Sequence, residues 1–195
     1  MKISTKAILL VVIIVFIDQL SKTLVKNYMY PGQYIPIIGN WFKIYFIENP
    51  GMAFGMILKI KYGKLLLTTL RIIFSIVFSI VIRNLIEANK SKYIVFSLCL
   101  ILAGAIGNVI DSIFYGVIYN YAPLMHGMVV DMLYFPIIDT YLPDWLPIWG
   151  GERFLFFSPI FNFADSSITI GIIIFAILYN KESKLNSKKA QNLKT

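Results

Sequence analysis

The sequence predicts an all-α membrane protein with four transmembrane helices and a small β element outside the membrane. Of its 195 residues, 58% are hydrophobic and only 14% are charged, and the mean hydropathy is +0.74. A soluble domain has about 25% charged residues, so this much apolar surface has to face lipid. The apolar residues form four segments, and two longer stretches of mixed polarity lie between them.

Each apolar segment approaches the length of about 20 residues that a helix needs to cross a bilayer. The predicted spans are residues 7–25, 65–82 and 93–113, and a fourth that begins near Ile160 and ends at Asn180. Lys2 and Lys6 precede the first span as in a signal peptide, but no small-residue cleavage pattern follows it. We therefore expect this helix to be retained. Residues 1–182 are predicted to form one transmembrane domain, and the basic tail, residues 183–195, to be disordered.

The positive charges predict the direction of the spans. The N-terminus, the stretch 83–92 and the tail after Asn180 carry ten Lys and Arg, whereas the two opposite loops, residues 26–64 and 112–158, carry six. By the positive-inside rule both termini are cytoplasmic and these two loops are outer loops. Because the charges are scattered between apolar runs, the net charge of +8 does not indicate a nucleic-acid partner.

The two outer loops differ in composition. In the first, Pro and Gly surround β-branched and aromatic runs such as WFKIYFI, which predicts short strands. The second contains YLPDWLPIWGG, and this density of aromatic residues favours a location at the membrane interface.

Several kinds of catalytic site are excluded. The single histidine, His126, cannot form a paired-histidine zinc site, and no GxSxG motif is present. A Ser–Lys dyad would use Ser21 and Lys22, but these residues are adjacent, so on a helix their side chains point about 100° apart and the pattern is only a weak signal for a dyad. The only cysteine, Cys99, lies in an apolar run and is predicted to be a packing thiol. We expect no metal and no organic cofactor.

Five of the ten acidic residues do not have the obvious role of a solvated surface charge: Asp18, Glu48, Asp111, Asp131 and Asp165. Counting helix rise puts three of them in the outer half of the membrane, with Asp165 about 7 Å inside the boundary. A charge at such depth is costly and usually serves a function.

Two aspartates that share a site offer one such function. One of them holds a proton and polarises a scissile carbonyl, while the other draws a proton from water. Spacing alone does not select the pair, and structural explanations remain open. Asp165 is a possible helix N-cap, Asp18 and Lys22 are spaced to pair at i, i+4, and Asn108 and Asp111 are spaced to hold helices together.

Five segments in order resemble the lipoprotein signal peptidases (signal peptidase II), which are bacterial membrane aspartic peptidases: DQLSK at 18–22, NPGMAFG at 49–55, GAIGNVID at 104–111, GMVVDML at 127–133 and FNFADSSITIG at 161–171. This resemblance implies that Asp131 and Asp165 are the catalytic pair. It also implies a set of residues that shape the site or bind substrate: Asp18, Lys22, Asn49, Gly51, Ala53, Phe54, Asn108, Asp111 and Asn162.

The resemblance further implies a function. The chain is expected to cleave lipid-modified prolipoproteins before their lipid-bearing cysteine, as a monomer among membrane lipids, at the outer face of the bacterial cytoplasmic membrane. Two features depart from the family. Ser112 stands where the family usually has arginine, and the stretch 132–159 is longer than expected. We interpret its aromatic part as a lid or a lipid-contacting arm.

An alternative function is that of a small transporter or channel subunit whose intramembrane carboxylates relay protons or cations. That function accounts for Asp18, Asp111 and Asp165, but it gives no reason for Asp131. A purely structural role would leave at least three buried acids without a purpose.

Overall fold

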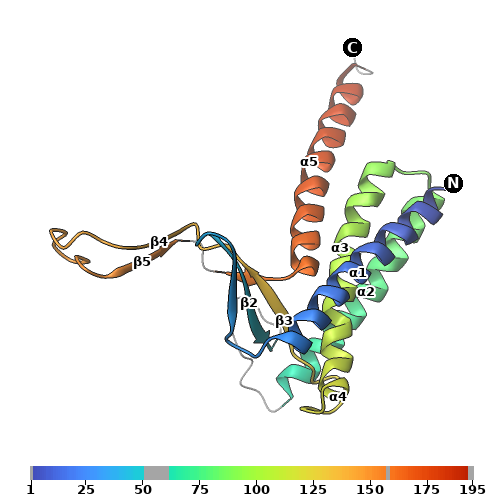
Figure 1. The fold of residues 1–195 in the computed structure, drawn as a ribbon. Helices are drawn as coiled ribbons and strands as arrows, with labels where there is room; N and C mark the ends of the chain where they lie inside the picture. Colours follow the sequence, from blue (N-terminus) through green and yellow to red (C-terminus); the bar gives the residue numbers. More distant parts are fainter. Residues whose placement is uncertain (1, 51–61, 157–158, 193–195) are drawn as a thin grey trace.

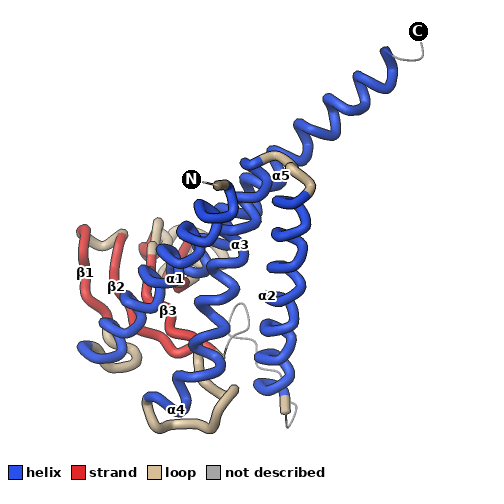
Figure 2. Tube along the Cα trace, turned by 90° about the vertical axis from the view of Figure 1, so that its right-hand side faces the viewer, coloured by secondary structure: helices blue, strands red, loops and turns tan. Residues whose placement is uncertain are grey.

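A computed structural model describes residues 2–50, 62–156 and 159–192 of the chain. Four long helices form a bundle: α1 (Ile3–Tyr28), α2 (Gly63–Glu87), α3 (Lys92–Ile110) and α5 (Phe163–Asn192) (Figure 1). All four contain a segment long and apolar enough to cross a membrane, which confirms the predicted helical membrane fold. The start of α1, the α2–α3 connection and the C-terminal part of α5 lie at the same end of the bundle (Figures 1 and 2).

The third and fourth helices differ from their predicted bounds. α3 continues through a π-helical turn, η2 (Asp111–Tyr115), into α4 (Gly116–Ile118), so the first residues of the predicted second outer loop are helical. α5 begins at Phe163 rather than near Ile160, because residues 160–161 pair with a strand instead. Asp165 therefore lies in the first turn of α5 and not several residues inside a longer helix. At its other end α5 continues to Asn192, through most of the tail for which the sequence predicts disorder.

The bundle is built around α3, which is buried along most of its length, whereas α1, α2 and α5 expose many apolar side chains. Glycines allow α3 and α5 to pack closely. A Cβ atom on Gly104 of α3 would lie 2.2 Å from the Ala164 carbonyl oxygen, and one on Gly171 of α5 would lie 2.7 Å from the Ser97 carbonyl oxygen. Small residues at helix contacts are typical of membrane bundles, and this contact fixes where α5 begins relative to α3.

A four-stranded antiparallel sheet lies beside α1 (Figure 2). Its order is β1 (Tyr34–Ile38), β2 (Phe42–Asn49), β3 (Val129–Tyr134) and β6 (Ile160–Phe161). The strands predicted in the first outer loop are thus confirmed as β1 and β2. The prediction did not include β3, which carries Asp131 opposite Ile47 of β2.

The rest of the second outer loop forms a hairpin arm of β4 (Ile138–Tyr141) and β5 (Arg153–Phe156), which extends crosswise to the helices from near the start of α5 (Figure 1). Its tip exposes Trp145 and Trp149. A location of this arm at the membrane interface remains a prediction.

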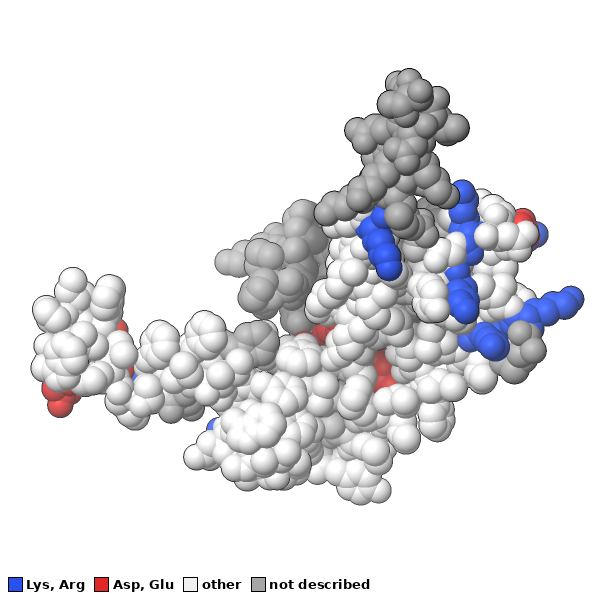
Figure 3. Space-filling model, turned by 90° about the horizontal axis from the view of Figure 1, so that it is seen from above, with Lys and Arg blue, Asp and Glu red and all other residues white. Residues whose placement is uncertain are grey.

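Lys and Arg side chains gather at the end of the bundle that holds the N-terminus and the α2–α3 connection (Figure 3). The sheet lies toward the opposite end.

Candidate active site

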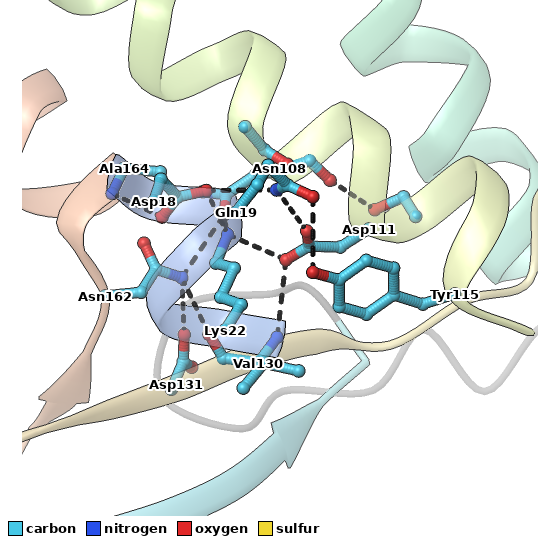
Figure 4. A network of polar contacts seen from close by, with 12 residues as sticks. Asp18, Gln19, Lys22, Asn108, Asp111, Tyr115, Val130, Asp131, Asn162 and Ala164 are labelled. Carbon is cyan, nitrogen blue, oxygen red and sulfur yellow. Dashed lines mark hydrogen bonds and ion pairs between the residues drawn. The ribbon is translucent and has the colours of Figure 1, made fainter. Parts of the chain in front are cut away.

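A polar cluster lies where α1, the α3–η2 junction, β3 and the start of α5 meet (Figure 4). Its members are Asp18, Gln19, Lys22, Asn108, Asp111, Asp131, Asn162 and Asp165. All of them except Gln19 were predicted from the sequence as site residues. Most are buried, and Asp165 is half-buried.

Lys22 is the centre of the cluster. Its Nζ atom lies 2.8 Å from Asp18 Oδ2 and 2.7 Å from Asp111 Oδ2, and it donates to Asn108 Oδ1 at 3.0 Å. The predicted i, i+4 pair of Asp18 and Lys22 is therefore present, but it is one half of a larger ion triad. A fully buried charge needs this many partners, because losing one leaves an uncompensated charge away from water.

Gln19 joins the triad to α3. Its Nε2 atom donates to Asp111 Oδ1 at 2.8 Å and to the Gly107 carbonyl oxygen at 3.1 Å, and its Oε1 atom accepts from the Tyr115 hydroxyl at 3.2 Å. A single glutamine in an apolar span was the only sequence signal for this role. Gly107 must lack a side chain, because a Cβ atom there would lie 2.5 Å from Asp18 Oδ2.

Asp165 takes part in capping α5, but not as the N-cap residue. Asn162 is the N-cap, since its Oδ1 atom accepts from the backbone N–H of Asp165 at 2.9 Å. In return, Asp165 Oδ2 accepts from the backbone N–H of Asn162 at 3.3 Å. This reciprocal pair is a capping box. The same α5 terminus is held against α1, because the backbone N–H of Ala164 donates to Asp18 Oδ1 at 2.9 Å.

Asn162 also connects the two acids that the resemblance implies as catalytic. While its Oδ1 atom caps Asp165, its Nδ2 atom donates to Asp131 Oδ1 at 2.7 Å (Figure 4). Each carboxyl has a further amide donor: Asn49 Nδ2 lies 2.9 Å from Asp131 Oδ2, and Asn108 Nδ2 lies 2.8 Å from Asp165 Oδ1. Three asparagines from three elements thus hold the orientation of both acids.

Asp131 retains a proton more readily than an ordinary carboxyl group. Burial on β3 raises its pKa to about 7, against the opposing effect of the hydrogen bond from Asn49. The nearby charge of Asp165 contributes to this rise. This is the behaviour expected when two carboxyls share a site, because both cannot ionise cheaply.

Two side chains of α2 also reach the edge of the polar cluster through Ser112, and neither is among the site residues predicted from the sequence. Arg71 Nη1 donates to Ser112 Oγ at 2.8 Å, and Lys64 Nζ donates to the same oxygen at 3.4 Å. Lys64 is the last residue of the predicted first outer loop, and Arg71 lies inside the second predicted span. The available signal for Arg71 was its position inside an apolar span, where a charge usually marks a functional site.

Two further sequence predictions have different outcomes. Gly51, Ala53 and Phe54 lie outside the described residues. Glu48, one of the five acidic residues without an obvious role at the surface, is part of β2 and forms an ion pair with Lys26. The Lys26 ammonium group also lies 4.3 Å from the centre of the Tyr119 ring, so this pair connects α1, β2 and the segment after α4.

The comparison with known families agrees with this geometry. A family model described as signal peptidase (SPase) II matches residues 10–180, nearly the whole chain. This chain belongs to the signal peptidase II family.

Two relatives illustrate the similarity. The lipoprotein signal peptidase of Porphyromonas gingivalis is 43% identical over 193 residues, covering 90% of this chain and 83% of that protein. The lipoprotein signal peptidase of Amoebophilus asiaticus is 42% identical over 172 residues, covering 84% of this chain and 72% of that protein.

Solved structures of bacterial membrane enzymes support the same fold for this signal peptidase II. One of them, at 28% identity, has a TM-score of 0.64 and covers 92% of this chain and 90% of its own. A second, at 26% identity, has a TM-score of 0.61 with coverages of 90% and 92%. The chain is a bacterial multi-pass membrane protease, and these similarities give no support to the alternative function of a transporter or channel subunit.

Proposed function

We propose that this signal peptidase II is an aspartic endopeptidase, which removes the signal peptide of lipid-modified prolipoproteins by cleaving before the diacylglyceryl-cysteine. The observation that carries the chemistry is Asn162, which binds Asp131 through its side-chain nitrogen and Asp165 through its side-chain oxygen. The substrate class follows from the relatives, which are named lipoprotein signal peptidases.

Asp131 is the protonated member of the pair, because its pKa of about 7 keeps a proton on it near neutral pH. Its O–H group donates to the carbonyl oxygen of the scissile peptide and polarises it. Asp165 accepts a proton from a water molecule, and the water oxygen bonds to the carbonyl carbon. In the second step the C–N bond breaks, and the proton on Asp165 passes to the leaving nitrogen, which becomes the amino group of the lipid-bearing cysteine.

The ion triad contributes to this chemistry by holding the helices that carry the acid pair in place. Lys22, Asp18 and Asp111 hold α1 against α3, and the Asp18 bond to the Ala164 N–H holds the start of α5. The side-chain amide of Asn108 links the triad to the acid pair, because it accepts a hydrogen bond from Lys22 and donates one to Asp165. Gly51, Ala53 and Phe54 remain predicted as substrate-binding residues of the stretch after Asn49.

We place the enzyme in the cytoplasmic membrane with the acid pair toward its outer face. The Lys- and Arg-rich end of the bundle faces the cytoplasm by the positive-inside rule, and the sheet lies toward the opposite end. A lipid-anchored substrate presents its scissile bond near the membrane surface, where Asp165 lies in the first turn of α5. We propose that the enzyme acts as a monomer, with prolipoprotein and membrane lipids as its partners and no nucleic acid.

The test is cleavage of a diacylglyceryl-modified prolipoprotein by purified enzyme in detergent or lipid. Asp131→Asn and Asp165→Asn keep the shape of each side chain and remove its titration, so each is expected to abolish cleavage. Glu87→Gln is a matched control, because Glu87 is exposed at the last turn of α2, where it pairs only with Arg83 among the described contacts. Wild-type cleavage by either aspartate variant would disprove the two-acid mechanism.

A further inference from the structure

Two cationic side chains enter the site from α2, the helix that contributes no member of the polar cluster. Lys64 and Arg71 are seven residues apart, about two helical turns, so they project from one face of α2. Both are half-buried, and both donate to the hydroxyl of Ser112. Lys64 also donates to the Pro50 carbonyl oxygen at 3.0 Å, beside Asn49, which binds Asp131.

Ser112 connects the Arg71 guanidinium to the acid pair. The Ser112 side chain is fully buried, and its hydroxyl donates to the Asn108 carbonyl oxygen at 2.9 Å. The hydroxyl oxygen therefore accepts from the guanidinium. The side chain of Asn108 in turn donates to Asp165, so the position of Arg71 is coupled to that of the acid through two residues.

With Arg71 included, the charges of the site balance when its carboxyl groups together hold one proton. The described part of the site contains four carboxyl groups and three cationic groups, which are Asp18, Asp111, Asp131 and Asp165 with Lys22, Lys64 and Arg71. The Arg71 guanidinium interacts electrostatically with Asp165, Asp111 and Asp131. Because a net buried charge is costly, the site is most stable when the four carboxyls together hold one proton.

We propose that Arg71 is a positioning residue of this enzyme, which keeps the Asp131–Asp165 pair at one shared proton near neutral pH. This inference rests on the two-acid mechanism proposed above. It also accounts for the departure at position 112, since the positive charge is supplied from α2 and the serine there provides the hydroxyl that holds it.

Loss of the guanidinium has a specific consequence. With Arg71 replaced by Gln, four carboxyls face two cations, and charge balance then requires two protons. A pair in which both carboxyls are protonated has no base to accept the proton of water. The rate at neutral pH therefore falls about tenfold or more, and both limbs of the pH–rate profile move to higher pH by about one unit. Raising the pH partly restores the rate.

The experiment measures kcat and kcat/KM for a lipid-modified prolipoprotein between about pH 5 and 9, for wild type, Arg71→Gln and Arg71→Lys. The Lys variant keeps the charge without the planar fork, so its rate falls while its limbs stay near those of wild type. Arg83→Gln, at the exposed end of the same helix, is the matched control and is expected to behave as wild type. Limbs of Arg71→Gln that coincide with those of wild type overturn the proposal, even if the variant is slower.

A second pair of variants keeps the test decisive if Arg71→Gln does not fold. Ser112→Ala removes the hydroxyl that holds the guanidinium, and it is expected to move the limbs in the same direction by a smaller amount. Ser112→Arg combined with Arg71→Gln returns a guanidinium to the site, and the limbs are expected to return toward wild type. If neither variant moves the limbs as stated, Arg71 has no electrostatic role. Should Asp131→Asn or Asp165→Asn remain active, the two-acid mechanism itself is what fails.

Discussion

Replacing Lys22 by Met tests the ion triad at the centre of the site. The substitution keeps most of the apolar volume, but it leaves Asp18 and Asp111 without the ammonium group that lies within 2.8 Å of both. The least costly response is for one of the two carboxylates to take up a proton from solvent. At pH 7, protonating a carboxyl of ordinary pKa costs about 4 kcal/mol. Breaking a buried ion pair costs a similar amount, about 3–5 kcal/mol.

The expected loss of unfolding free energy is therefore about 4 kcal/mol at neutral pH, and it becomes smaller as the pH falls toward 4. The direction of this pH dependence follows from the number of protons that the folded and the unfolded chain bind. The folded variant holds a proton that its unfolded chain releases above about pH 4, so each rise in pH destabilises the variant relative to wild type. Equilibrium or thermal unfolding in detergent micelles at several pH values measures this difference.

Lys6→Met is the matched control, because Lys6 is exposed on the first turns of the same helix. Adding Asp111→Asn to Lys22→Met removes one of the uncompensated carboxylates and should recover part of the lost stability. If Lys22→Met is as stable as Lys6→Met at neutral pH, or if its deficit does not change with pH, the triad does not have the stabilising role described here.

Three other predictions concern packing, titration and the arm. Gly104→Ala is expected to lower the unfolding free energy by about 1–3 kcal/mol and to reduce cleavage, because its Cβ would lie 2.2 Å from the Ala164 carbonyl oxygen. Unfolding and rate measurements check this, and a neutral effect would contradict the close α3–α5 packing. Asp131 binds its proton more tightly in the folded chain than in the unfolded chain. Its contribution to stability is therefore full below about pH 4 and is lost as the pH rises through its folded pKa of about 7. Unfolding curves of Asp131→Asn should lack this part of the pH dependence. Deleting residues 139–150, which removes the Trp-bearing tip of the arm, should lower turnover more than stability, and unchanged kinetics would rule out a role as a lid or lipid contact.

The four helices could be predicted from composition, because a long apolar run has few other solutions in a membrane protein. Their ends could not. At the start of α5, Ile160 and Phe161 are as apolar as the residues that follow, and only the partner strand β3 makes them extended. This error of a few residues changed the interpretation of Asp165, which belongs to a capping box and to the proposed acid pair at the same time.

In the site, too, contacts between residues close in the sequence could be predicted, whereas contacts that depend on helix packing could not. Asp18 and Lys22 were readable as a local pair, since their spacing on one helix is visible in the sequence. The contact of Lys22 with Asp111 was not, because it depends on how α1 and α3 pack. The contact of Arg71 is the clearest example of one that the sequence does not indicate. It lies 41 residues from Ser112 in the chain, and nothing in its local sequence indicates that its guanidinium reaches that hydroxyl.

The order in which the residues of the polar cluster are synthesised has a consequence for the assembly of the enzyme. Asp18 and Lys22 enter the membrane with the first helix, whereas Asn162 and Asp165 arrive with the last one. A chain that is still being synthesised therefore has no assembled acid pair until α5 packs against α3. Its own first helix, preceded by two lysines as a signal peptide would be, is inserted before any protease exists in the same chain. The only cysteine, Cys99, is buried in the third helix, so no cysteine stands directly behind that first helix as a site of lipid attachment.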